Sequence, residues 1–116
     1  MKFNTQVCTT REQSERLLAL GLKKETADMG WVKQIIGDRY VIAIAEDYSF
    51  IDVSAWSLHR LISLCEHGIT INHRENVVTY NMCRDFYGLE TIYDNLIDCI
   101  EYLINEGWFN KEYLEE

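Results

Sequence analysis

The sequence lacks any run of about 20 apolar residues, the length that a helix needs to cross a lipid bilayer. The segment Met1 to Gln6 also lacks the apolar run of a secretory signal, so we expect a cytoplasmic protein without a membrane partner. Hydrophobic residues make up 47% of the 116 residues and charged residues 26%, a balance that excludes a disordered or low-complexity chain. A chain of this length can bury one core without disulfides, so we predict a single domain over residues 1–116.

Closely spaced cysteines and glycine-rich loops are also missing. The four cysteines form no C-x-x-C pair, which predicts reduced thiols that mostly fill the core; they are Cys8, Cys65, Cys83 and Cys99. The six glycines are isolated and match no phosphate-binding pattern such as G-x-G or G-K-[ST]. We therefore expect no nucleotide and no other cofactor.

Residues that carry metal or nucleophilic chemistry occur without a recognisable arrangement. The nearest approach to a metal site combines Cys65 to His67 with His73 and Cys83, and this spacing matches no standard zinc pattern. Ser57 and His59 have no sequence context that assigns them to a nucleophile and its base. The sequence thus identifies no catalytic residue and no metal ligand, and a small metal-dependent hydrolase is kept only as an alternative.

Basic residues are scarce in the last quarter of the chain. Residues 1–84 contain ten Lys or Arg and ten Asp or Glu, whereas residues 85–116 contain nine acids and one lysine. The net charge of −8 therefore comes from the C-terminal part. Nucleic-acid binding needs clustered basic side chains, so this balance makes direct binding to DNA or RNA an unfavoured function.

Three helices are predicted from their caps and apolar spacing. Thr10 with Gln13 has the spacing of a capping box and predicts a helix over residues 11–20, and Thr91 with Asp94 repeats it before a helix that ends at Gly107. Between them, Ser54 is a suitable N-cap for a helix that ends near Gly68.

Two hairpins are predicted between these helices. Residues 31–36 and 39–45 flank a Gly37-Asp38 turn, and residues 69–73 and 77–82 flank a second turn. Residues 39–45 are apolar on both faces, which indicates a central strand. The expected fold is therefore α+β, in the order α-β-β-α-β-β-α, with an antiparallel sheet of roughly four strands from two hairpins covered by three helices.

Acidic residues follow one side of the predicted last helix. Asp94, Asp98 and Glu101 lie at positions i, i+4 and i+7, and Glu90 precedes them. We call these four residues the acidic line. The simpler interpretation is a solvated helix face, and the alternative is a docking stripe for a basic partner, including a mimic of the DNA backbone.

Two tryptophans are candidates for contact with a partner. The chain contains three tryptophans and seven tyrosines, enough to build an aromatic surface if some of them are exposed. Trp56 lies off the apolar stripe of its predicted helix, and Trp108 follows the last helix. Each of them either packs in the core or forms part of an interface.

Three segments together resemble a group of small uncharacterised proteins from phage-derived and other mobile regions of gut-bacterial genomes. The segments are residues 26–31 (TADMGW), 55–61 (AWSLHRL) and 95–107 (NLIDCIEYLINEG). The resemblance implies a bacterial or phage setting and an accessory role, and it brings no activity, cofactor or catalytic residue.

From these features we expect a non-catalytic module that binds another protein or a second copy of itself. Its contact surface is either an apolar and aromatic patch or the acidic line. An acidic inhibitor of a basic host protein is the first alternative, and the metal-dependent hydrolase is the second.

Overall fold

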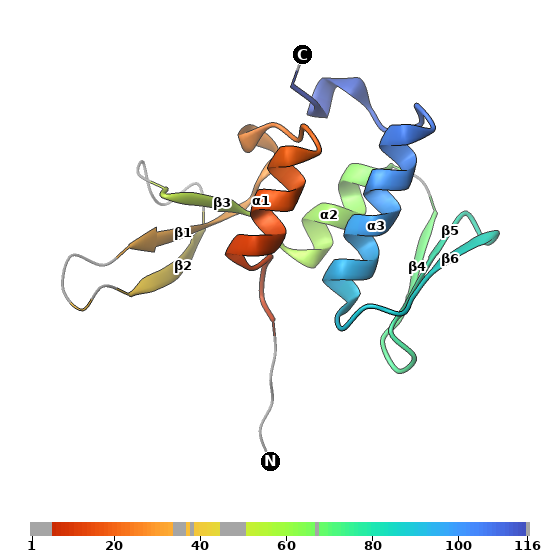
Figure 1. Ribbon diagram of the computed structural model, residues 1–116, viewed down its shortest axis with the longest axis horizontal. Helices are drawn as coiled ribbons and strands as arrows, with labels where there is room; N and C mark the ends of the chain where they lie inside the picture. The colour runs from red at the N-terminus through yellow and green to blue at the C-terminus, as the bar shows by residue number, and fades with distance from the viewer. Residues whose placement is uncertain (1–5, 34–36, 38, 45–50, 67, 116) are drawn as a thin grey trace.

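Three helices lie between two small sheets in the computed structural model of the chain (Figure 1). The structure describes residues 6–33, 37, 39–44, 51–66 and 68–115. The helices are α1 (Arg11–Ala19), α2 (Leu58–Cys65) and α3 (Ile92–Asn105). Short 3₁₀ turns occur at Lys24–Thr26 and Lys111–Tyr113. The α+β class, with three helices and antiparallel strands, is confirmed.

Within the described residues, six strands form two three-stranded sheets, so the prediction of one sheet of roughly four strands was wrong. The first sheet has the order β2-β1-β3, with β1 (Met29–Lys33), β2 (Tyr40–Ile44) and β3 (Val53–Ala55). The second has the order β4-β5-β6, with β4 (Ile69–Asn72), β5 (Val77–Tyr80) and β6 (Arg84–Phe86). The molecule measures 48 × 44 × 20 Å, so the two sheets and the helices lie side by side in a thin body instead of stacking.

The first sheet places β1, not β2, in its centre. Gly30 of β1 pairs with Ala43 of β2 on one side and with Ser54 of β3 on the other. The prediction that residues 39–45 form a central strand was therefore wrong: among the described strands, β2 pairs with β1 alone. Its two-sided apolar pattern is that of an inner strand, although it lies at an edge.

The second helix begins three residues later than predicted. Ser54 is not its N-cap, because Val53 and Ser54 are hydrogen-bonded into β3 opposite Trp31 and Gly30. Ser57 caps the helix instead, and its hydroxyl accepts a hydrogen bond from the backbone N–H of Arg60. A local cap signal was thus outweighed by strand pairing that depends on a distant segment.

The caps of the other two helices were predicted correctly. Thr10 and Gln13 form a reciprocal capping box at α1, with side-chain to backbone distances of 3.1 and 3.0 Å. Thr91 caps α3 by accepting from the N–H of Asp94 at 3.1 Å. These bonds satisfy backbone donors that a helix start leaves unpaired, so they can be predicted from spacing alone.

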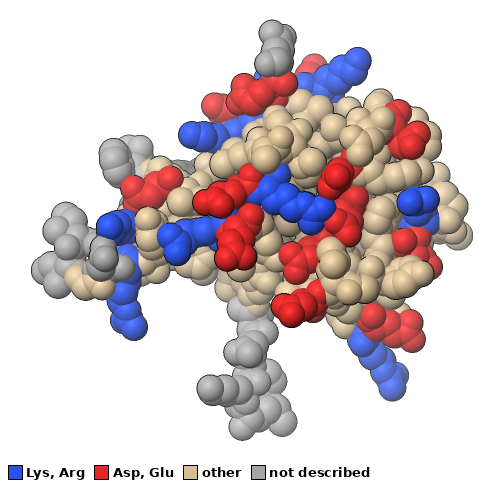
Figure 2. Space-filling model, in the orientation of Figure 1, with Lys and Arg blue, Asp and Glu red and all other residues tan. Residues whose placement is uncertain are grey.

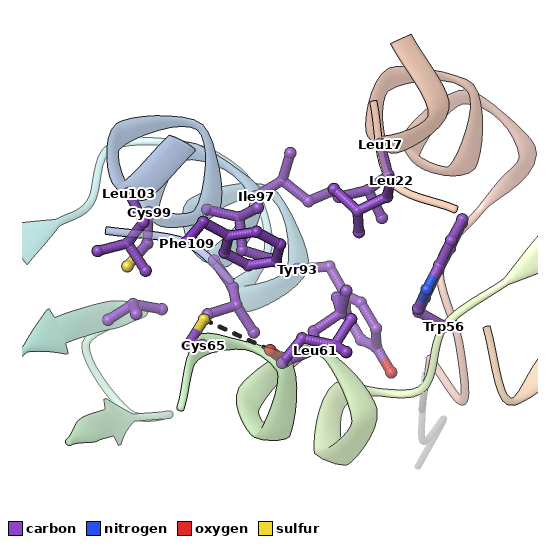
Figure 3. Close-up of a cluster of buried hydrophobic side chains, with 14 of the residues drawn as sticks. Leu17, Leu22, Trp56, Leu61, Cys65, Tyr93, Ile97, Cys99, Leu103 and Phe109 are labelled. Atoms are coloured by element: carbon purple, nitrogen blue, oxygen red, sulfur yellow. Dashed lines mark hydrogen bonds between the residues drawn. The ribbon is translucent and has the colours of Figure 1, made fainter. Parts of the chain in front are cut away.

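One buried cluster connects the helices with the second sheet (Figure 3). α3 contributes six of its fifteen buried residues, more than any other element, among them Leu96, Ile97, Ile100 and Leu103, all without exposed surface. Leu61 and Leu64 of α2 and Val78 of β5 pack against them. Burying an aliphatic side chain is worth about 1.5–3 kcal/mol, so this cluster is the main stabilising contact between the elements.

Some expectations concern residues outside the described part of the chain. The Asp38 half of the first predicted turn, most of the predicted loop at residues 47–52, and His67 belong to this group.

Candidate functional site

Trp56 lies in the core and is not available to a partner. Its side chain is fully buried beside α1, and its indole Nε1–H donates to the hydroxyl of Thr26 at 2.9 Å. Its backbone N–H donates to the hydroxyl of Thr9 at 3.0 Å. Trp56 therefore packs in the core and does not form part of an interface. It follows β3, and its side chain points into the core before α2 begins.

Trp108, in contrast, reaches the surface just after α3. About half of it is exposed (49%), and Gly107 precedes it with a φ of +76°, a conformation that glycine adopts without strain. The ring of Trp108 stacks on Tyr80 of β5, with centroids 6.2 Å apart and planes inclined by 22°. The residue that follows α3 thereby places an aromatic ring against β5 of the second sheet.

Further rings extend this contact into an aromatic surface, which we define as Tyr80, Phe86, Tyr102 and Trp108. Tyr102 of α3 meets Trp108 edge to face at 5.9 Å and Phe86 at 5.7 Å. Arg84 of β6 holds its guanidinium over Tyr102, 4.3 Å from the ring centroid. Aromatic and cation–π contacts of this kind are worth about 0.5–1 kcal/mol each beyond burial, so the rings hold one another in place before any partner arrives.

The β5–β6 turn projects next to these rings. Asn81 and Met82 have φ values of +48° and +58°, and Met82 is 90% exposed. The prediction that this strand extends over residues 77–82 was wrong at its end, because β5 ends at Tyr80 and the chain reverses at Asn81 and Met82. A left-handed conformation costs a side chain such as Met roughly 1–2 kcal/mol. The turn thus holds an apolar side chain in solvent at a conformational cost.

A hollow lies between the turn and the tryptophan. It has a volume of about 500 Å³ and is lined by Tyr80, Asn81, Cys83 and Trp108. Two of its four lining residues are aromatic, and Cys83 is the exposed member of the four cysteines. Sequence reasoning identified Trp108 but missed this hollow, since it depends on a left-handed turn at Asn81 and Met82, and methionine does not favour that conformation.

The acidic line is partly neutralised by a helix packed beside it. Arg16 of α1 donates through Nη2 to Asp98 Oδ1 and, at 2.8 Å, to Glu101 Oε2. Burial alone would lower the pKa of Arg16, but the two carboxylates outweigh it and the pKa is raised. Figure 2 shows basic side chains set among acidic ones over the face where α1 and α3 lie.

The other two members of the acidic line differ from each other. Asp94 accepts a hydrogen bond from Gln13 at 2.8 Å and one from the Thr91 hydroxyl at 2.9 Å. Glu90 precedes the helix and is exposed. The structure therefore brings Asp94, Asp98 and Glu101 into the contact between α1 and α3, and leaves Glu90 at its rim.

The buried thiols have properties that oppose nucleophilic chemistry. The Cys99 thiol, together with burial, raises the pKa of Cys65, and the Cys65 Sγ donates to the carbonyl of Leu61 at 3.4 Å (Figure 3). Burial, with a smaller effect of Asp28, raises the pKa of Cys8 to about 11. Because the thiolate is the reactive form, thiols that stay protonated at neutral pH are poor candidates for a nucleophile.

We next consider the other residues that could act in catalysis or metal binding. Ser57 donates its hydroxyl hydrogen to the carboxylate of Asp28 and accepts the N–H of Arg60 as the cap of α2, so its hydroxyl is engaged in structural hydrogen bonds. Within the described ranges, no group of three His, Cys, Asp or Glu side chains is placed to hold a metal ion. A second hollow of about 660 Å³ is lined by Ile44 together with charged residues of both signs, Lys24, Glu25, Asp28 and Arg60.

Comparisons of the chain with protein-family models, curated proteins and solved structures find no match. In the part of the chain that the structure describes, no helix has the length and apolar character needed to span a membrane.

Proposed function

We propose that this protein is a non-catalytic module that binds another protein through its aromatic surface. The observation that carries the proposal is Trp108, half exposed on a preformed stack of rings beside an apolar-lined hollow. Binding energy at protein interfaces concentrates on such anchors, with Trp, Tyr and Arg over-represented among them. All three residue types meet here, in Trp108, Tyr102 and Arg84.

The position of Met82 supports the same function. Methionine is flexible and polarisable, and it adapts to varied apolar surfaces. Met82 is exposed at a left-handed turn next to the hollow. The protein therefore presents both a projecting apolar side chain and an apolar hollow to a partner. The preferred ligand is therefore an apolar segment of a folded protein, with one aliphatic or aromatic side chain that enters the hollow.

The cellular setting of this module is part of the proposal. The resemblance of residues 26–31, 55–61 and 95–107 to proteins of bacterial mobile regions supports an accessory role in a bacterium or its phage, in the cytoplasm. The acidic inhibitor has less support, because Arg16 already occupies the carboxylates of Asp98 and Glu101. The metal-dependent hydrolase gains no support from the described residues.

Retention of a partner by immobilised protein tests the proposal. Wild type is compared with Trp108→Ala, with the triple variant Asp94→Asn, Asp98→Asn, Glu101→Gln, and with a control, Val7→Ala, which trims an exposed apolar side chain outside the aromatic surface. Bacterial lysate is applied at low and at moderate salt, and each variant is checked for cooperative unfolding. We expect Trp108→Ala to lose the partner and the control to keep it, with little effect of salt.

Two results would contradict this function. Retention that survives in Trp108→Ala but disappears in the triple variant, and that weakens steeply with salt, would assign binding to the acidic line. If wild type retains no protein at either salt concentration, the proposal that the protein is a binding module is wrong.

A further inference from the structure

The outer strand of the first sheet has the composition of an inner strand. The five residues of β2, Tyr40–Ile44, carry no charge, no proline and no glycine. Three of its side chains are exposed, although they are β-branched and apolar: Val41, Ile42 and Ile44. Natural edge strands normally carry a charge, a proline or a bulge that blocks further pairing. Within its five residues β2 has none of these devices.

The backbone of β2 is also paired on one side only, as far as the described strands show. Its partner is β1, in continuous register from Tyr40 opposite Lys33 to Ile44 opposite Met29. An antiparallel strand directs alternate N–H and C=O groups to its other side, where a further strand can bond to them. The sheet that contains β2 projects away from the three helices (Figure 1), so its outer edge lies at the periphery of the molecule.

We propose that β2 is a self-association edge, at which two copies of this chain pair antiparallel about a two-fold axis. The two three-stranded sheets then join into one sheet of six strands, and β2 becomes the inner strand that its sequence indicates. In the register that pairs all five residues, Ile42 lies opposite the partner's Ile42. Tyr40 then lies opposite the partner's Ile44, and Val41 opposite the partner's Ala43.

This register gives only apolar cross-strand pairs. Tyr40, Ile42 and Ile44 lie on one face of the sheet, because their partners in β1 alternate in the same way. A two-fold axis perpendicular to the sheet keeps that face on the same side in both copies, so exposed Ile42 and Ile44 are covered by equivalent side chains. Cross-strand pairs of β-branched and aromatic residues stabilise strand pairing relative to alanine.

The charges near β2 do not oppose a second copy in antiparallel orientation. Although the chain carries −8, residues 29–44 contain Lys33, Arg39 and one acid, so this region does not share the acidic excess. Arg39 of one copy lies about 20 Å along the strand from that of the other, beyond a screening length of about 8 Å. The acid-rich α3 lies beyond α1 as seen from β2 (Figure 1), which keeps the two acidic regions apart.

Light scattering over a concentration series tests the association. Five residue pairs make a smaller contact than a standard interface, so we expect a monomer–dimer equilibrium with a dissociation constant in the micromolar range. The mass should rise from 13.7 kDa towards twice that value as the concentration increases to about 300 µM. Ile42→Lys places like charges directly opposite each other and should weaken the dimer at least about tenfold.

A matched control separates this edge from general surface hydrophobicity. Leu89 has the same exposed fraction as Ile42, 40%, and follows the second sheet. Leu89→Lys should dimerise like wild type, and so should Trp108→Ala, which disables only the proposed partner site. Failure of self-association and failure of the aromatic surface are therefore distinguishable.

A cysteine at the two-fold axis tests the register. Ile42→Cys in a Cys83→Ser background should form a covalent dimer under mild oxidation, whereas Leu89→Cys in that background should not. A wild-type mass that stays at 13.7 kDa throughout the series would overturn the proposal. So would a dimer that Ile42→Lys leaves intact.

Discussion

The contact of Arg16 with the acidic line decides whether these carboxylates are structural or available to a partner. We consider Arg16→Met, which keeps most of the aliphatic length of the side chain and removes the guanidinium. The change breaks the bonds to Asp98 and Glu101 and leaves these two carboxylates one helical turn apart without a cation. It should therefore destabilise the fold.

The size of the effect follows from exposure. The three side chains are 36–42% exposed, so each ion pair is screened and worth no more than about 0.5 kcal/mol. Repulsion between Asp98 and Glu101 at i, i+3 is present in both proteins, so it does not add to the difference between them. The loss is therefore about 0.5–1 kcal/mol, which for a chain of this size lowers the melting temperature by about 2–4 °C.

Thermal and urea unfolding at low salt and at about 1 M salt measure this loss, which should shrink by more than half at the higher concentration. Arg74→Met is the matched control, because Arg74 lies exposed in the β4–β5 turn, and it should change stability by less than about 0.5 kcal/mol. Equal stability of Arg16→Met and wild type at low salt would refute the reasoning. The carboxylates would then be available to a basic partner, and the acidic inhibitor would regain support.

Three further variants probe the interior. Burial holds the pKa of Cys8 at about 11 against 9.0 when unfolded, so the folded state keeps a proton that the unfolded state loses. This difference should lower stability by roughly 2 kcal/mol from pH 9 to 11, and urea unfolding of Cys8→Ala should show a shallower fall. Gly30→Ala places Cβ 2.5 Å from Ile51 Cγ2 and should cost about 1–3 kcal/mol in urea unfolding, less when combined with Ile51→Ala. Trp56→Phe loses the bond to Thr26 and ring volume, and calorimetry should show a loss of about 1.5–3 kcal/mol.

The parts of the fold that the sequence predicted depend on near neighbours. The Thr10–Gln13 and Thr91–Asp94 caps lie within four residues, and the apolar face of α3 follows from helical spacing. The alternation of strand and turn residues likewise predicted β1 with β2 and β4 with β5. Each of these signals acts within a short segment, so the rest of the molecule need not be known.

The parts that were missed depend on distant segments. The strands β3 and β6 have three residues each, too few for a period-two pattern, and they exist because β1 and β5 offer an open side. The salt bridge from Arg16 to Asp98 spans 82 residues of sequence, and no spacing rule connects them. The exposure of Met82 depends on a left-handed backbone that methionine does not favour.

The two proposed surfaces lie on different sheets, and this separation has a functional consequence. β2 belongs to the first sheet, and the aromatic surface connects the second sheet with the end of α3, on the other side of the helices (Figure 1). Pairing through β2 therefore leaves Trp108 of both copies uncovered and directs the two aromatic surfaces away from each other. Such a dimer can hold two partner molecules, or two sites of one large partner, and the second contact then forms at a high effective concentration. A module whose single hollow binds weakly thereby gains affinity through assembly, without any additional contact at the hollow.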